Sequence, residues 1–124
     1  MEYSFVKLTT SWKQRRRSVA ALVSKYATVV DHYQSNPFTV VKMELRVNDG
    51  MTMLASAISR LGGGDKWNAE RGFRIAKGRA INDLARQIVN HERHQWRYYN
   101  SFVPFTDYDF QPREAKPEAV EVQQ

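Results

Sequence analysis

Residues 65–99, DKWNAERGFRIAKGRAINDLARQIVNHERHQWRYY, constrain the fold more than any other part of this sequence. At about 100° per residue, small and apolar side chains fall on one side of a helix and arginines on the other. A helix with one apolar face is stable only when that face is buried. The segment therefore predicts a long helix that packs on the rest of the domain through Phe73, Ala76, Ala80, Ile81, Leu84, Ala85 and Ile88.

Four arginines form a narrow stripe on the opposite side of this helix, within roughly 40° of one another on ideal geometry. They are Arg79, Arg86, Arg93 and Arg97, with Asn82 and Asn90 among them. Arginine donates hydrogen bonds in a bidentate fork that suits phosphate and carboxylate groups. The stripe predicts a surface for an anionic partner. The alternative is a solvated face with local pairing to Asp83 and Glu92.

A first helix is expected after Ser11, because Ser11 and Gln14 match a capping box. Val19, Val23, Tyr26, Val30 and Tyr33 then share one stripe, which extends this helix to Ser35-Asn36-Pro37, where the proline ends it. Its first turns contain the triplet Arg15, Arg16 and Arg17. Cations at a helix N-terminus oppose the helix dipole, which favours a binding role for the triplet over a merely solvated face.

Residues 38–47, FTVVKMELRV, alternate as a strand that buries Val41, Met43, Leu45 and Val47. The following Asn48-Asp49-Gly50 indicates a hairpin, with Asp49-Gly50 as a two-residue loop. The return strand runs from Met51 to about Arg60. In that register Leu45 faces Leu54, and Val41 faces Ile58.

These elements predict an α+β fold: a helix, an antiparallel β-hairpin and a long C-terminal helix packed on the sheet, with a short N-terminal strand within residues 2–9 as an optional element. Residues 1–110 form a single basic domain, and residues 111–124 a flexible tail. Because a two-stranded sheet is marginal alone, the helices must share its core or the chain must dimerise. The heptad-like stripe of the first helix makes a homodimer one expected assembly.

The chain carries a net charge of +6 over 124 residues. Its last fourteen residues contain two basic and three acidic groups, so residues 1–110 carry +7. A basic body attracts nucleic acid (DNA or RNA), an acidic protein surface or anionic lipid. Cysteine is absent, and no apolar run approaches the roughly 20 residues that span a bilayer. We therefore expect a cytoplasmic protein with no membrane partner.

No enzymatic activity, cofactor or metal is expected from the motifs. His91 and His94 have no indicated third metal ligand, and no side chain lies in a recognisable nucleophile setting. The Gly62–Asp65 segment lacks the Gly-Lys-Ser/Thr ending of a phosphate loop, and Asp65 would repel phosphate there. This segment instead predicts a turn with a helix cap.

Aromatic side chains are frequent near the C-terminus. Trp96 and Tyr99, next to the arginine stripe, are candidates for stacking on nucleic-acid bases or for a protein interface. The aromatics of residues 102–110 are expected to fold over the core instead. Gly72 and Gly78, inside the long helix, each cost on the order of 1 kcal/mol relative to alanine. We expect the sheet or another backbone to pass close to both.

Residues 61–80, LGGGDKWNAERGFRIAKGRA, resemble a segment of small bacteriophage proteins in which a strand precedes Asp-Lys-aromatic-Asn and a Gly-x-x-Ile-Ala-x-Gly-Arg-Ala run. The resemblance covers about a third of the chain and implies a phage accessory role without a mechanism. The order helix, hairpin, helix is also similar to that of the double-stranded RNA-binding domain. That fold has three strands between its helices, and this sequence predicts two.

The leading functional hypothesis is a non-enzymatic, phage-encoded accessory protein that binds nucleic acid. Its binding residues would be Arg15, Arg16, Arg17, Arg79, Arg86, Arg93, Arg97, Trp96 and Tyr99. The alternative is a host-takeover protein that inhibits a host nucleic-acid machine, such as a polymerase, a nuclease or a CRISPR defence complex. A structural role in the virion is a third class, which would show as self-association into large oligomers.

Overall fold

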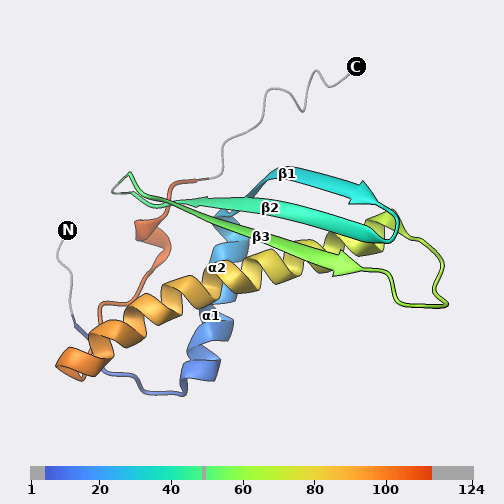
Figure 1. The fold of residues 1–124 in the computed structure, drawn as a ribbon. Coiled ribbons are helices and arrows are strands. Elements are labelled where there is room, and N and C mark those ends of the chain that lie inside the picture. Colours follow the sequence, from blue (N-terminus) through green and yellow to red (C-terminus); the bar gives the residue numbers. More distant parts are fainter. Residues whose placement is uncertain (1–4, 49, 113–124) are drawn as a thin grey trace.

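The computed structural model describes residues 5–48 and 50–112. Two helices and a three-stranded antiparallel sheet make up an α+β fold, in which the long C-terminal helix packs on the sheet (Figure 1). The elements are α1 (Trp12–Tyr26), β1 (Thr28–Ser35), β2 (Phe38–Arg46), β3 (Thr52–Arg60), α2 (Ala69–Tyr99) and the short 3-10 helix η1 (Asp107–Asp109).

The core lies between the sheet and the two helices. The long helix α2 packs directly on β2 and β3, and α1 packs mainly on α2 (Figure 1). The predicted apolar side of α2 is confirmed, because Ala76, Ala80, Leu84 and Ala85 are fully buried. The predicted inner face of β2 is confirmed as well. Its buried side chains are Val41, Met43, Leu45 and Val47.

The first helix is shorter than predicted, and the sheet has a third strand. Ser11 caps α1 by accepting the Gln14 N–H at 3.1 Å, but the helix ends at Tyr26, and Ala27 is already extended. Residues 28–33, TVVDHY, are rich in the β-branched and aromatic residues that favour strands. Val30 and Tyr33 therefore lie in β1, and Asn36-Pro37 forms a hairpin turn instead of a helix end. The stripe that suggested a homodimer is thus divided between two elements.

The predicted register of the second hairpin is wrong by one residue. The Val47 N–H donates to the Met51 carbonyl at 2.8 Å, so the loop contains three residues, 48–50. Its Gly50 has φ +92°, a left-handed conformation typical of three-residue hairpin loops. Leu45 consequently pairs with Met53, not with Leu54.

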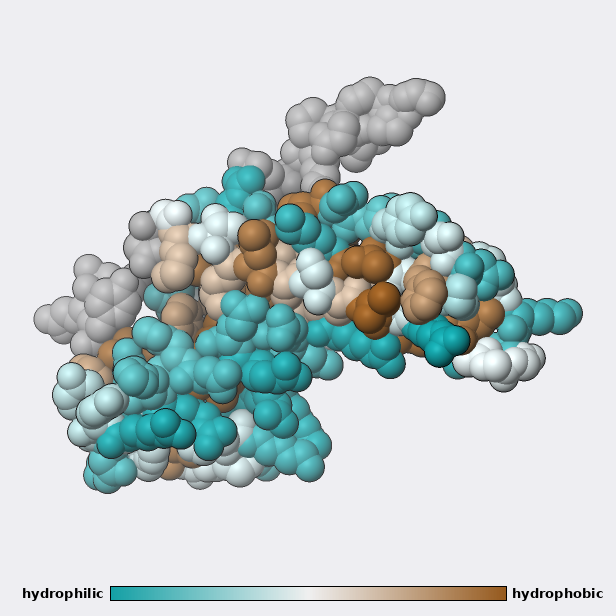
Figure 2. All heavy atoms as spheres, in the orientation of Figure 1, coloured by the Kyte–Doolittle hydropathy of each residue, from teal (hydrophilic) through white to brown (hydrophobic). Residues whose placement is uncertain are grey.

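A one-residue slip moves every side chain of a strand to the other face. Leu54 and Ile58 therefore lie on the outer face of the sheet, where they are 49% and 51% exposed. Tyr33, Val40 and Ile58 are register neighbours across the three strands. We call this surface the open sheet face; its apolar residues are Tyr33, Phe38, Val40, Leu54 and Ile58. Apolar side chains gather over β3 in Figure 2, beside the hydrophilic ones that cover the helices.

The two glycines of α2 differ in their surroundings. A Cβ on Gly72 would lie 2.6 Å from the Thr39 Oγ1 atom, so this glycine allows the helix to approach the sheet closely. A Cβ on Gly78 would have nothing within 4 Å. The expectation of close packing is confirmed for Gly72 and wrong for Gly78.

The segment after α2 returns over the core, as expected for its phenylalanines. Phe102 and Phe110 are buried, whereas Tyr108 is 74% exposed. The optional N-terminal strand is represented in the described residues by one β-bridge, in which Val6 and Phe102 exchange both backbone hydrogen bonds.

The predicted flexible tail begins at Gln111, whose N–H donates to the Arg46 carbonyl. Residues 113–124 of this tail lie outside the described residues.

A cluster of polar contacts joins η1 to the end of α1. The Tyr26 hydroxyl donates to the Asp107 Oδ1 atom at 2.8 Å, and the Lys25 Nζ atom lies 3.3 Å from the same oxygen. The hydrogen bond from Tyr26, followed by that from Lys25, lowers the pKa of the Asp107 carboxyl. The same bond raises the pKa of the Tyr26 phenol.

We predict opposite effects of alanine at the two glycines of α2. Gly72→Ala forces a methyl group against the buried Thr39 side chain and should lower the free energy of unfolding by about 1–3 kcal/mol. Gly78→Ala meets open space and should raise it by about 0.5–1 kcal/mol, because alanine loses less backbone entropy. Urea unfolding of both variants tests this, and stabilisation by both would contradict the close approach at Gly72.

We predict that the stability contributed by Asp107 is lost in acid. Because its pKa is lowered in the folded protein, the unfolded chain takes up a proton first as the pH falls. The stabilisation by Asp107 is fully present above the ordinary pKa of an aspartate carboxyl. It disappears as the pH falls through the lowered pKa of Asp107 in the folded protein. The difference in unfolding free energy between wild type and Asp107→Asn should therefore shrink between neutral pH and about pH 3. Urea unfolding at both pH values measures it, and a constant difference would contradict the assignment.

Candidate nucleic-acid interface

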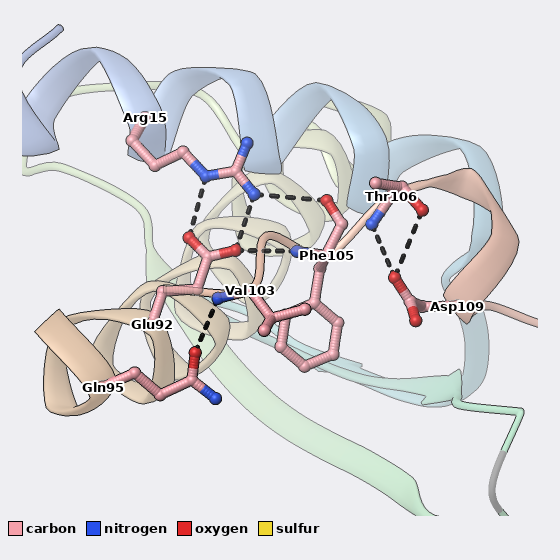
Figure 3. A network of polar contacts seen from close by, with 7 residues as sticks. All are labelled: Arg15, Glu92, Gln95, Val103, Phe105, Thr106 and Asp109. Atoms are coloured by element: carbon pink, nitrogen blue, oxygen red, sulfur yellow. Dashed lines mark hydrogen bonds and ion pairs between the residues drawn. The ribbon is translucent and has the colours of Figure 1, made fainter. Parts of the chain in front are cut away.

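Arg15 lies inside the fold and not on the predicted binding surface. Its Nε and Nη2 atoms donate to the two carboxylate oxygens of Glu92 at 2.8 and 2.6 Å (Figure 3). Its Nη2 atom also donates to the Phe105 carbonyl at 3.2 Å, and the Phe105 N–H donates to Glu92 at 2.9 Å. The Glu92 side chain is fully buried. This ion pair joins α1, α2 and the C-terminal segment, so Arg15 has a structural role.

Because Arg15 points inward, the next two arginines of α1 lie on its outer surface. Residues advance by about 100° along a helix, which turns Arg16 and Arg17 away from Glu92. Both are exposed. The predicted triplet therefore divides into one partly buried residue paired with Glu92 and two surface cations.

The packing of α1 on α2 brings two separate basic motifs together. Lys13, Arg16 and Arg17 of α1 and Asn82 and Arg86 of α2 line an open groove of about 470 Å³. We call this the helix groove. Four of its lining side chains are cationic and none is acidic. Hydrophilic side chains cover the two helices in Figure 2.

One acidic residue lies next to the helix groove. The Asp83 Oδ1 atom is 3.3 Å from the Arg86 Nη1 atom, and both side chains are partly exposed. An exposed ion pair of this kind contributes about 0–1 kcal/mol. Arg86 can therefore exchange this partner for a phosphate at little cost.

The basic surface continues along α2 beyond the groove. The Arg93 guanidinium lies 5.7 Å from the centre of the Trp12 ring, and Trp12 in turn packs edge-to-face on Trp96. Arg93 and Arg97 are both exposed. The predicted stripe thus places Arg86, Arg93 and Arg97 on one exposed surface, with Trp96 half-buried beside it.

Arg79, the first arginine of the stripe, is occupied elsewhere. Its Nη1 atom donates to the Ile58 carbonyl at 2.8 Å, and Gln87 donates similarly to the Leu54 carbonyl at 3.1 Å. Both carbonyls belong to β3, an edge strand of the sheet. These side chains satisfy backbone groups that an edge strand leaves unpaired. Tyr99 lies at the far end of α2, 67% exposed and edge-to-face with Phe5.

Lys13 is not among the predicted binding residues, and the core position of Glu92 was not predicted either. Lys13 lies three and four residues before Arg16 and Arg17, a spacing that places side chains on one helix face, so its signal was present. Glu92 is flanked by polar residues and resembles any solvent-exposed glutamate in the sequence. Its partners in the core come from distant segments, Arg15 of α1 and the Phe105 backbone after α2.

No protein-family model, curated protein or solved structure matches this chain. Among the described residues, no helix has the length and apolar character needed to cross a membrane. Within residues 5–48 and 50–112, no three His, Cys, Asp or Glu side chains gather where they could hold a metal ion.

We predict that Arg15 and Arg16, neighbours of equal charge, differ strongly in their effect on stability. Arg15→Ala leaves the buried Glu92 carboxylate without its cation and should lower the free energy of unfolding by about 3–5 kcal/mol. Arg16→Ala should change it by at most about 0.5 kcal/mol. Chemical denaturation measures both, and equal effects would contradict the structural role of Arg15.

Proposed function

We propose that this chain is a small, non-enzymatic protein that binds the sugar-phosphate backbone of nucleic acid through its two helices. The carrying observation is the helix groove, in which Lys13, Arg16, Arg17 and Arg86 meet without an acidic lining residue. The resemblance of residues 61–80 to phage proteins supports an accessory role in a phage as its setting. The net charge of +6 favours association with any polyanion.

The length of the basic surface suits several phosphates. Arg86 and Arg97 are eleven residues apart, about 16 Å along a helix. Duplex DNA rises by about 3.4 Å per base pair along its axis, so this distance equals the rise of roughly five base pairs. Each contact would release counterions and make the affinity dependent on salt.

Aromatic side chains at the end of α2 offer a further type of contact. Tyr98 and Tyr99 are 73% and 67% exposed and lie next to Arg97 in the sequence. Exposed aromatics beside cations can stack on unpaired bases. Single strands therefore belong among the ligands to be tested.

The observed order of elements bears on duplex RNA. The chain has a helix, three antiparallel strands and a second helix in this order. The double-stranded RNA-binding domain also has three strands between its helices, whereas the sequence alone predicted two. Duplex RNA is recognised largely through its shape, its phosphates and its 2′-hydroxyl groups. This similarity of element order makes duplex RNA the most informative of the probes.

Binding should depend on the position of the cations and not only on total charge. We compare Arg16→Ala/Arg17→Ala/Arg86→Ala with a control of equal net charge, Lys7→Ala/Lys42→Ala/Arg74→Ala, whose residues are exposed and lie outside the groove. Fluorescence anisotropy is recorded with labelled duplex RNA, duplex DNA and single strands across a salt series. The groove variant should lose most of its affinity and about two to three units of the log–log salt slope, and the control much less.

Two results would overturn the proposal. The first is an absence of binding to every probe at low salt. The second is an equal loss of affinity in the groove variant and its charge-matched control, because binding would then follow net charge alone.

The open sheet face favours a second candidate function, inhibition of a host nucleic-acid machine through protein contact. Tyr33, Leu54 and Ile58 are between 49% and 65% exposed there, and contiguous exposed apolar side chains mark protein interaction sites. Capture of a stoichiometric host protein that survives nuclease and high salt, and is lost in Leu54→Ser/Ile58→Ser, would favour the inhibitor. Loss of every partner after nuclease would favour nucleic-acid binding.

A further inference from the structure

A separate basic pocket lies where β3 leads into α2. Its volume is about 90 Å³, and it is formed by the end of β3, the loop at residues 61–68 and the first turns of α2. Three arginines from these elements line it: Arg60, Arg71 and Arg79. None of the residues that line the helix groove takes part in it.

The two guanidinium groups with contacts inside the protein point in different directions. Arg79 uses Nη1 to donate to the Ile58 carbonyl and retains four of its five N–H donors for a ligand. The Arg60 guanidinium lies 5.8 Å from the centre of the Phe38 ring, on the open sheet face, so Arg60 lines the pocket without directing its charge toward α2. Within the described part of the chain, the side chain of Arg71 has no hydrogen-bond partner.

The charge of the pocket defines the class of ligand. On the side of α2, Arg71, Arg79 and Asp65 give its lining a net charge of +1. The first-turn N–H of Arg71 is already taken by the Asn68 side chain at 3.0 Å, so the attraction for an anion comes from the guanidinium groups.

We propose that this pocket binds a phosphomonoester dianion, with Arg71 and Arg79 as its donors. A phosphomonoester has its second pKa near 6 and is mostly a dianion at neutral pH, so two guanidinium groups balance its charge. Arginine suits it because the guanidinium fork donates two parallel hydrogen bonds to phosphate oxygens. Arg71 and Arg79 leave the pocket with a net positive charge after Asp65 is counted. The phosphate can belong to a small molecule or to the end of a nucleic-acid strand.

The test titrates inorganic phosphate into the full chain at constant ionic strength, with calorimetry and tryptophan fluorescence as readouts. Trp67 lines the pocket and should report binding. Saturable binding is expected, weakened about tenfold or more by Arg71→Ala and unchanged by Arg74→Ala, a neighbouring exposed arginine outside the pocket. In Trp67→Phe, the fluorescence change should disappear while the calorimetric signal remains. Absence of saturable binding, or an equal response of the Arg71→Ala and Arg74→Ala variants, would overturn the proposal.

A second arm identifies the source of the phosphate. Oligonucleotides with a 5′-phosphate or a 5′-hydroxyl are titrated into the chain carrying Arg16→Ala/Arg17→Ala/Arg86→Ala, which removes the cations of the helix groove. A preference for the 5′-phosphate that Arg71→Ala abolishes identifies the end of a strand. Binding of inorganic phosphate without such a preference identifies a small phosphorylated ligand. Both results are independent of whether the helix groove binds nucleic acid.

Discussion

The ion pair between Arg15 and Glu92 is the interaction on which the arrangement of this protein depends. A carboxylate without solvent contact is costly unless it is paired and its remaining acceptor capacity is used. Here Arg15 supplies two donors and the Phe105 backbone supplies a third (Figure 3). The three groups come from α1, α2 and the segment that follows α2. One buried charge therefore holds together three parts of the chain that are far apart in the sequence.

The same pair determines which cations reach the surface. With Arg15 directed inward, Arg16 and Arg17 face out beside Lys13, and the packing of α1 on α2 places them opposite Asn82 and Arg86. The helix groove is thus a product of helix packing and not of either motif alone. Arg79 belongs to the stripe by its spacing, but it reaches the edge of β3 and the phosphate pocket proposed there.

The loop between β2 and β3 has a comparable effect on the other side of the molecule. Three residues in place of two shift the pairing by one, so Leu54 and Ile58 face out and the inner face of β3 carries Ala55 and Ala57 instead. The open sheet face therefore follows from one turn. The close approach of α2 to the sheet has a separate origin at Gly72, which lies against Thr39 of β2.

The sequence alone determined the long helix, its buried face and the inner face of β2, because each depends on a local repeat of apolar side chains. The Asn48-Asp49-Gly50 turn determined the β2–β3 hairpin but not its register. The prediction was wrong at Val30 and Tyr33, because their spacing fits both a helical stripe and a strand. Pairing with β2 decides for the strand. Tertiary structure alone made Glu92 a core residue, divided the arginine triplet and joined Arg16 and Arg17 to Arg86. The physical reason is that burial of a charge and convergence of cations both require groups from distant segments, and no local pattern records which segments will meet.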